Sequence, residues 1–198
     1  LSFPPASSAE NTCVAFIFRI FQTLYVENFL NTGYAVDLIG FSMGGVIASH
    51  LARKYKIGRL FLIAPAFEYF TPKNVVQKTK EALSKKEDGG VPKLPTSFTS
   101  CFIDVVKMCK EDIKYVQCPV CIVHGNCDET IPYKSSISRM EEIPHNQKRL
   151  FIIHKGKHHL MTNKDTGYET FQIFKMFMNR TIINDKIEFV KDIYNENR

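Results

Sequence analysis

Glycine and proline are few in this sequence, at 10 and 9 of 198 residues. This low content excludes a linker-rich or low-complexity protein, and we find no internal repeat. Charge is not in excess either, because 44% of the residues are hydrophobic and 23% are charged, as in an ordinary globular domain. A disordered chain, a fibre and a repeat array are therefore excluded. At roughly 100–200 residues per domain, we expect residues 1–198 to form one domain.

The sequence also lacks a long hydrophobic run. Its most apolar stretch, residues 13–30, contains Arg19 and Glu27, whereas a membrane span needs about 20 predominantly apolar residues. We interpret this stretch as a buried amphipathic helix and expect no stable insertion into a membrane. Residues 1–5 show neither the basic nor the apolar region of a signal peptide, so we expect a cytoplasmic protein.

Metal-binding and disulfide patterns are missing among the six cysteines. Cys118 and Cys121 form a C-x-x-C pair, but no second Cys or His pair lies at zinc-finger spacing. A chain of this length can bury an adequate core without disulfides. We therefore expect reduced, buried thiols and no metal site.

A concentrated basic surface is not apparent, although 26 Lys and Arg against 20 Asp and Glu give a net charge of +6. Nucleic-acid binding needs those charges on one surface. In residues 68–117 the lysines are instead interleaved with Glu81, Glu87 and Asp88. We expect a solvated face there and no nucleic-acid partner.

Strand-length apolar runs alternate with helical patterns along the rest of the chain. The four runs are residues 36–39, 60–64, 120–123 and 150–153. Continuous apolar strands separated by helices predict an α/β class, with a mainly parallel sheet covered by helices on both faces. Residues 68–117 interrupt the alternation as a predicted insertion of helix, loop and helix, and residues 183–198 resemble a charged appended helix.

Two apolar stripes at helical spacing are expected to face the core. They are Ala48, Leu51, Ala52 and Tyr55 in the first, and Tyr168, Phe171, Phe174 and Met178 in the second.

The most informative segment is G-x-S-x-G at residues 40–44, between an expected buried strand and a helix. A serine on such a sharp turn has strained backbone geometry and projects its Oγ above the sheet. Gly40 and Gly44 lack a Cβ, so we expect both to let the turn close. Ser42 is therefore the candidate nucleophile, and the N–H of Met43, at the helix start, is a candidate oxyanion donor.

A serine nucleophile needs a base that is oriented by a carboxylate. The run 120–123 ends in H-G-N-C-D-E-T-I-P, which resembles the acid-loop motif of the α/β-hydrolase superfamily. This resemblance assigns the acid to Asp128, with Glu129 as a weaker candidate. His124 and His154 are interpreted as structural residues that hydrogen-bond to the backbone.

The base is expected after the last core strand, where His158 and His159 are adjacent. The stretch from His159 to Asn163 resembles the H-x-x-x-N pattern of monoacylglycerol-lipase-like hydrolases and short carboxylesterases. His158 would instead match a G-x-H variant. We favour His159 and keep His158 as the alternative.

The resemblance covers residues 34–180 and implies a serine hydrolase that cleaves small carboxylic esters through an acyl-enzyme, without a cofactor. Thioesters and amides stay open as substrates, as does the oligomeric state. Residues 68–117 then correspond to the cap. The superfamily's second oxyanion donor lies after an earlier strand, and residues 1–33 contain no His-Gly pair. The chain is therefore expected either to be N-terminally truncated or to arrange residues 1–33 unusually. A non-catalytic binding or scaffold protein without a complete oxyanion hole is the alternative function.

Overall fold

A five-stranded parallel sheet forms the centre of the computed structural model, which describes residues 24–68, 96–180 (backbone alone for 96–102) and 185–190. The strands are β1 (Leu38–Phe41), β2 (Leu60–Ile63), β3 (Val120–Gly125), β4 (Lys148–Ile153) and β5 (Lys186–Val190). Their order in the sheet is their order in the chain, and every neighbouring pair is parallel.

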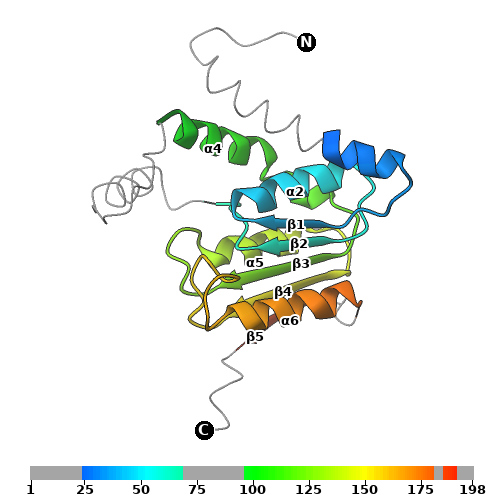
Figure 1. Ribbon diagram of the computed structural model, residues 1–198. Helices are drawn as coiled ribbons and strands as arrows, with labels where there is room; N and C mark the ends of the chain where they lie inside the picture. The colour runs from blue at the N-terminus through cyan, green and yellow to red at the C-terminus, as the bar shows by residue number, and fades with distance from the viewer. Residues whose placement is uncertain (1–23, 69–95, 181–184, 191–198) are drawn as a thin grey trace.

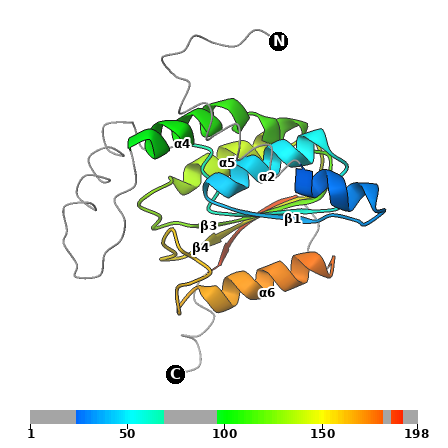
Figure 2. The same ribbon diagram turned by 45° about the horizontal axis from the view of Figure 1, so that its top comes forward.

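Helices cover both faces of this sheet. They are residues 24–31, α2 (Met43–Lys54), α4 (Thr96–Cys109), the short 3-10 helix η2 (Asp112–Tyr115), α5 (Tyr133–Glu142) and α6 (Gly167–Met178). Figures 1 and 2 show α2, α4 and α5 on one side of the sheet and α6 on the other. The predicted α/β class with a parallel, two-sided sheet is therefore confirmed.

Two apolar cores, one on each face, explain why β2, β3 and β4 are buried on both faces. The same prediction for residues 36–39 is wrong, because the strand is β1 at Leu38–Phe41 and its Ile39 and Phe41 are exposed. Leu60 and Leu62 of β2 join the core under α2, α4 and α5, whereas Phe61 and Ile63 join the core under α6. Because side chains alternate along a strand, both sets must be apolar when helices cover both faces. Burying one such side chain contributes about 1.5–3 kcal/mol. The two cores therefore stabilise the sheet whose strand ends carry the candidate site.

The apolar stripe predicted on α6 is confirmed only in part, because Phe174 and Met178 pack against the core and Tyr168 and Phe171 do not. Ile173 and Phe177 are buried, whereas Tyr168 and Phe171 are exposed. Phe174 lies at the edge of the core and packs edge-on against the ring of Phe61. The sequence offers apolar residues on both sides of this helix, so spacing alone did not identify the buried side.

The prediction of a helix over residues 183–198 is also wrong in its described part, because residues 186–190 form β5. Ile187 and Val190 pack against the two cores. Arg149 of β4 forms an ion pair with Glu188 across the strands. Charged residues alternate with apolar ones along this edge strand, and this pattern led to the prediction of a solvated helix. Residues 191–198 lie outside the described residues.

The predicted cap is described only in its second half, as α4 and η2, since residues 69–95 lie outside the described part. Cys109, Cys118 and Cys121 are buried thiols, and Cys127 is an exposed one. Burial raises the pKa of the Cys118 thiol to about 11. In the described residues, no helix has both the length and the apolar character needed to cross a bilayer.

Candidate active site

Ser42 occupies the turn between β1 and α2, at the carboxyl end of the sheet. Its φ of 53° and ψ of −122° lie in a region that non-glycine residues rarely adopt, at a cost of about 1–3 kcal/mol. Backbone hydrogen bonds hold the turn, because Ser42 N–H donates to Ile63 O at 3.0 Å and Ala66 N–H donates to Ser42 O at 3.0 Å. Hydrogen bonds with residues in and just after β2 therefore hold Ser42 in this strained conformation.

Glycines make this turn possible, but they are not the pair that the sequence predicted. A Cβ on Gly40 would lie 2.5 Å from Gly44 O, and one on Gly45 would lie 2.8 Å from Pro65 Cβ. A Cβ on Gly44 would meet no described atom within 4 Å. The expectation that Gly44 is needed for closure is therefore wrong, and Gly45 takes that role.

Asp128 lies in the loop after β3 and has a buried carboxylate. Its Oδ1 accepts hydrogen bonds from the backbone N–H groups of Thr130 and Ile131, both at 2.8 Å. Burial alone would raise the pKa of this carboxyl, but hydrogen bonds from His124, His158 and the Ile131 N–H outweigh it. The pKa of Asp128 is therefore well below its ordinary value, and the group is an anion.

His158, not His159, lies beside Ser42, which corrects the favoured prediction. His158 Nε2 is 3.1 Å from Ser42 Oγ, and its Nδ1 is 2.7 Å from Asp128 Oδ2. His159 is exposed and its ring lies 5.4 Å from that of His158, centre to centre. Adjacent side chains of an extended loop point in different directions, so only one of the two can reach the serine.

The positions of the acid and base loops depend on a close backbone contact between Gly125 and Gly156. A Cβ on Gly125 would lie 2.1 Å from Gly156 O. Cys127 N–H also donates to Gly156 O at 2.9 Å, and Lys155 N–H donates to Asn126 Oδ1 at 2.7 Å. These contacts set the path of the loop after β4, which brings His158 to Ser42.

His124 is a member of the site that the sequence interpretation assigned to backbone bonding alone. Its Nε2 does contact a backbone oxygen, Ile131 O, at 3.2 Å. The same nitrogen lies 3.2 Å from Asp128 Oδ2, and Nδ1 lies 2.7 Å from Ser136 Oγ. The motif H-G-x-x-D places this histidine four residues before the acid, and that spacing was the available signal.

The geometry suits acyl transfer. Since Asp128 is an anion, His158 Nδ1–H donates to it, which leaves the Nε2 lone pair to accept the Ser42 hydroxyl proton. Met43 is the first residue of α2, where a backbone N–H has no acceptor within the helix. Glu129, the weaker acid candidate, is exposed.

Comparison with known sequences finds one family and no curated relative. The family model described as serine aminopeptidase, S33, matches residues 77–165, which include Asp128 and His158 but not Ser42. No curated protein matches the sequence.

Solved structures resemble most of the chain. A monoacylglycerol lipase from Paleococcus ferrophilus has a TM-score of 0.65 at 16% identity, covering 81% of this chain and 74% of that one. A soluble variant of monoglyceride lipase from Saccharomyces cerevisiae has a TM-score of 0.61 at 17% identity, covering 84% and 69%. A structure reported with the metagenome-derived lipolytic enzymes LipS and LipT has a TM-score of 0.67 at 16% identity, covering 88% and 78%. At such identities the similarity concerns the fold. The chain therefore has the α/β-hydrolase fold, and the solved structures that it resembles include lipases and lipolytic enzymes.

Proposed function

We propose that this protein is a serine hydrolase that cleaves small carboxylic esters through an acyl-enzyme intermediate. The observation that carries the proposal is the continuous chain of contacts from Ser42 Oγ through His158 to Asp128, at 3.1 and 2.7 Å. A serine at a strained strand-to-helix turn, in contact with a histidine held by an anion, is the arrangement that activates a hydroxyl group. We call these three residues the triad.

In the proposed reaction, Ser42 Oγ attacks the ester carbonyl carbon while its proton passes to His158 Nε2. The Met43 N–H donates to the developing oxyanion, and Asp128 stabilises the imidazolium. The C–O bond to the alcohol then breaks, and His158 returns the proton to the leaving oxygen. Water attacks the acyl-enzyme by the same route and releases the carboxylic acid and free Ser42. No cofactor takes part in these steps.

Esters are the proposed substrates because the lipases and lipolytic enzymes named above have the same fold. The matched family is described as an aminopeptidase, so a panel of p-nitrophenyl esters should be run beside aminoacyl p-nitroanilides. We expect turnover of the esters, and turnover confined to the anilides would contradict the proposed substrate class. The cytoplasmic location stays a prediction from the sequence.

The first test is covalent labelling with a fluorophosphonate, which reacts only with an activated serine. We expect the wild-type chain to label and Ser42→Ala not to label. His158→Gln should slow labelling by about 10²–10⁴-fold, the usual contribution of a general base.

His159→Gln is the matched control, since it alters the adjacent histidine and leaves the triad intact. It should label at a rate close to that of the wild type. A folded wild-type chain that does not label would contradict the proposal and favour the non-catalytic binding protein. Loss of labelling in His159→Gln with retention in His158→Gln would overturn the assignment of the base.

A further inference from the structure

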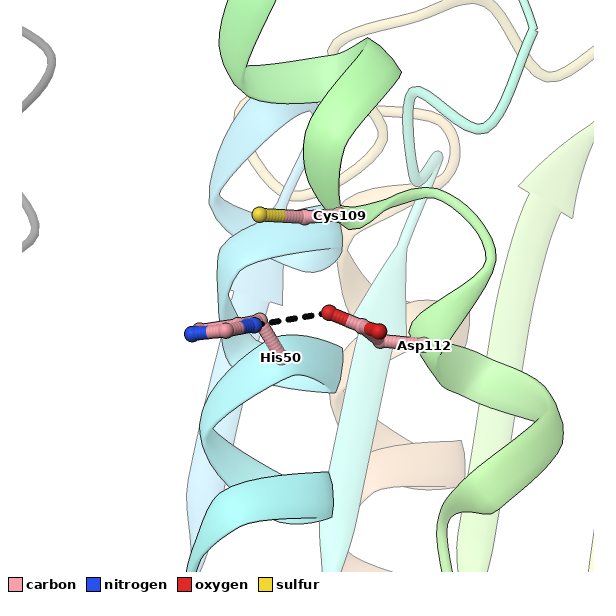
Figure 3. A group of neighbouring side chains, drawn as sticks. All are labelled: His50, Cys109 and Asp112. Carbon is pink, nitrogen blue, oxygen red and sulfur yellow. Dashed lines mark hydrogen bonds and ion pairs between the residues drawn. The ribbon is translucent and has the colours of Figure 1, made fainter. Parts of the chain in front are cut away.

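A second cluster of polar side chains lies where α2 meets the end of α4 and the start of η2. It consists of His50 in α2, Cys109 as the last residue of α4, and Asp112 as the first residue of η2. One ligand atom of each lies within 4.8 Å of the other two. Figure 3 shows the Cys109 side chain beside the pair formed by His50 Nδ1 and Asp112 Oδ2, which are 2.7 Å apart. None of these residues takes part in the triad.

The three groups differ in chemistry, and burial removes two of them from water. Cys109 is 1% exposed and Asp112 4%, whereas the His50 side chain is 20% exposed. A thiolate, an imidazole and a carboxylate are the three ligand types that Zn²⁺ takes from proteins. The partial exposure of His50 places the cluster next to solvent.

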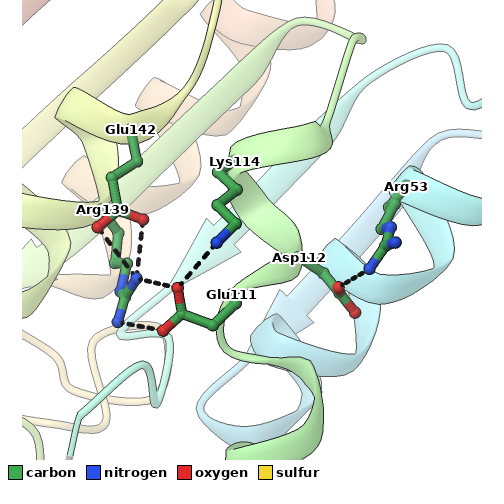
Figure 4. Close-up of polar contacts among 6 residues, drawn as sticks. All are labelled: Arg53, Glu111, Asp112, Lys114, Arg139 and Glu142. Carbon is green, nitrogen blue, oxygen red and sulfur yellow. Dashed lines mark hydrogen bonds and ion pairs between the residues drawn. The ribbon is translucent and has the colours of Figure 1, made fainter.

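Arg53 holds the carboxylate in an orientation that suits a metal ligand. Its guanidinium forms an ion pair with Asp112 Oδ1 (Figure 4), while Oδ2 faces His50. A ligating carboxylate is commonly hydrogen-bonded through its other oxygen, which fixes its direction. Because the Arg53 side chain is half exposed, water screens its charge from a nearby cation.

We propose that His50 Nδ1, Cys109 Sγ and Asp112 Oδ2 bind a divalent transition metal of the zinc type, with water as the fourth ligand. With bonds of about 2.0–2.3 Å, ligand atoms in a tetrahedral site lie about 3.3–3.6 Å apart. The His50–Asp112 pair must therefore open slightly, and the Cys109 sulfur must approach it. Binding releases the thiol proton of Cys109, and the His50 proton moves from Nδ1 to Nε2.

The network that His50, Asp112 and Arg53 form without a metal is the alternative explanation for the cluster. It already pairs the buried carboxylate with a cation, so the fold does not depend on the ion. A bound metal would add a direct link between α2, which carries Ser42 at its start, and the end of α4. The site is independent of hydrolysis and can be tested without it.

The experiment is a Co²⁺ titration of the metal-free chain, followed by displacement with Zn²⁺. A cysteine thiolate bound to Co²⁺ gives a charge-transfer absorption in the near ultraviolet, which the other ligands do not give. We expect one equivalent to bind and zinc to abolish the signal. Cys109→Ser should remove the charge-transfer band, and His50→Gln should weaken affinity at least tenfold.

Cys127→Ser is the matched control, because Cys127 is the exposed thiol and lies outside the cluster. It should keep the full signal, as should Ser42→Ala. Circular dichroism checks that each variant is folded. Absence of the band in the wild type, or an equal band in Cys109→Ser, overturns the metal site. A metal signal in a chain that does not label with fluorophosphonate would reject the hydrolase and leave this inference standing.

Discussion

The hydrogen bonds of the two ring nitrogens of His124 show how the side chain of Asp128, the proposed acid, is positioned. Nε2 faces two oxygens that only accept, Asp128 Oδ2 and Ile131 O. This nitrogen must therefore carry a proton, and Nδ1 shares a hydrogen bond of 2.7 Å with the Ser136 hydroxyl group. Asp128 Oδ2 thus receives N–H groups from two histidines, His124 and His158. The second of these bonds belongs to the triad, and the first one positions it.

His124→Asn removes the N–H that stabilises the Asp128 anion, so the pKa of Asp128 should rise. Because the carboxylate then protonates at a higher pH, the acid limb that protonation of Asp128 causes in the labelling rate should move upward. At neutral pH we expect a loss of about 10–100-fold, by analogy with residues that orient a metal ligand through a hydrogen bond. The measurement is the fluorophosphonate labelling rate against pH.

Ser136→Ala is a milder change, since it removes only the hydroxyl group that is hydrogen-bonded to His124 Nδ1. Its acid limb should move in the same direction by a smaller amount. A His124→Asn chain that melts earlier but has an unchanged pH profile would show that His124 acts on stability alone.

The two glycines of the serine turn should respond in opposite ways to alanine. Gly40→Ala places a methyl group against the backbone of Gly44 and should cost about 1–3 kcal/mol or more, as overpacking does. Gly44→Ala meets open space and should be neutral, or stabilising by up to about 1 kcal/mol, because alanine favours helices. Urea unfolding of both variants tests this, and equal losses would contradict the turn geometry.

Residue identity within a loop is what the sequence predicted least well. Ser42 and Asp128 follow directly from strand ends, where the apolar run and the turn motif define the position. His158 comes five residues after β4, beyond a turn in which Lys155 has a φ of 56° and Gly156 packs on Gly125. A positive φ at a lysine and a contact between distant glycines leave no local pattern, so the choice between adjacent histidines required the three-dimensional structure.

At the scale of elements, ion pairs fasten η2 to α5 (Figure 4). Arg139 of α5 is nearly buried and pairs with Glu111 at 3.0 Å and with Glu142 at 2.7 Å. These bonds lower the pKa of Glu111 and raise that of Arg139, against the opposing effect of burial. Glu111 directly precedes Asp112, so these ion pairs lie next to the proposed metal cluster.

Arg139→Met should destabilise the protein by about 1–3 kcal/mol, because it leaves two carboxylates without their shared donor. Glu142→Gln removes one partner that is 35% exposed and should cost no more than about 1 kcal/mol. Chemical denaturation at neutral pH and low salt measures both. A larger loss in Glu142→Gln than in Arg139→Met would contradict this ranking.

The loop between α5 and β4 should make stability depend on pH through His145. Burial lowers the pKa of His145, and the charge of nearby Lys148 lowers it further. A group with a folded pKa below its unfolded value of about 6.5 stabilises fully above that value. The contribution is lost as the pH falls through the folded pKa.

We therefore expect the wild-type free energy of unfolding to fall more steeply from pH 7.5 to pH 5 than that of His145→Gln. The comparison is one of slopes, so a constant cost of the substitution does not affect it. Parallel curves for the two proteins would show that His145 is not a source of the pH dependence.

Elements buried on both faces were predictable, and those at the margins were not. β2 and β3 are continuously apolar, and the stripe of Ala48, Leu51 and Ala52 is buried in α2 as expected. In β5 the charged side chains of Lys186 and Glu188 are exposed to water, and these charges concealed the strand in the sequence. In α6 the exposed Tyr168 and Phe171 are as apolar as the buried residues, so the pattern did not distinguish the two sides.

At the scale of the whole molecule, the triad collects residues from three strand ends. Ser42 follows β1, Asp128 follows β3 and His158 follows β4, so 116 positions separate the serine from the histidine. Only a correctly ordered sheet brings them together. The parallel arrangement is itself predictable from the alternation of strands and helices, because parallel strands require long crossover connections.

The contact between Gly125 and Gly156 has a kinetic consequence. Pairings between distant strands form slowly, since the entropy of closing a long loop must be overcome before the contact stabilises it. During refolding, helix formation measured by circular dichroism should therefore precede recovery of fluorophosphonate labelling. The interval between the two signals measures the time from helix formation to the contact between the loops that follow β3 and β4.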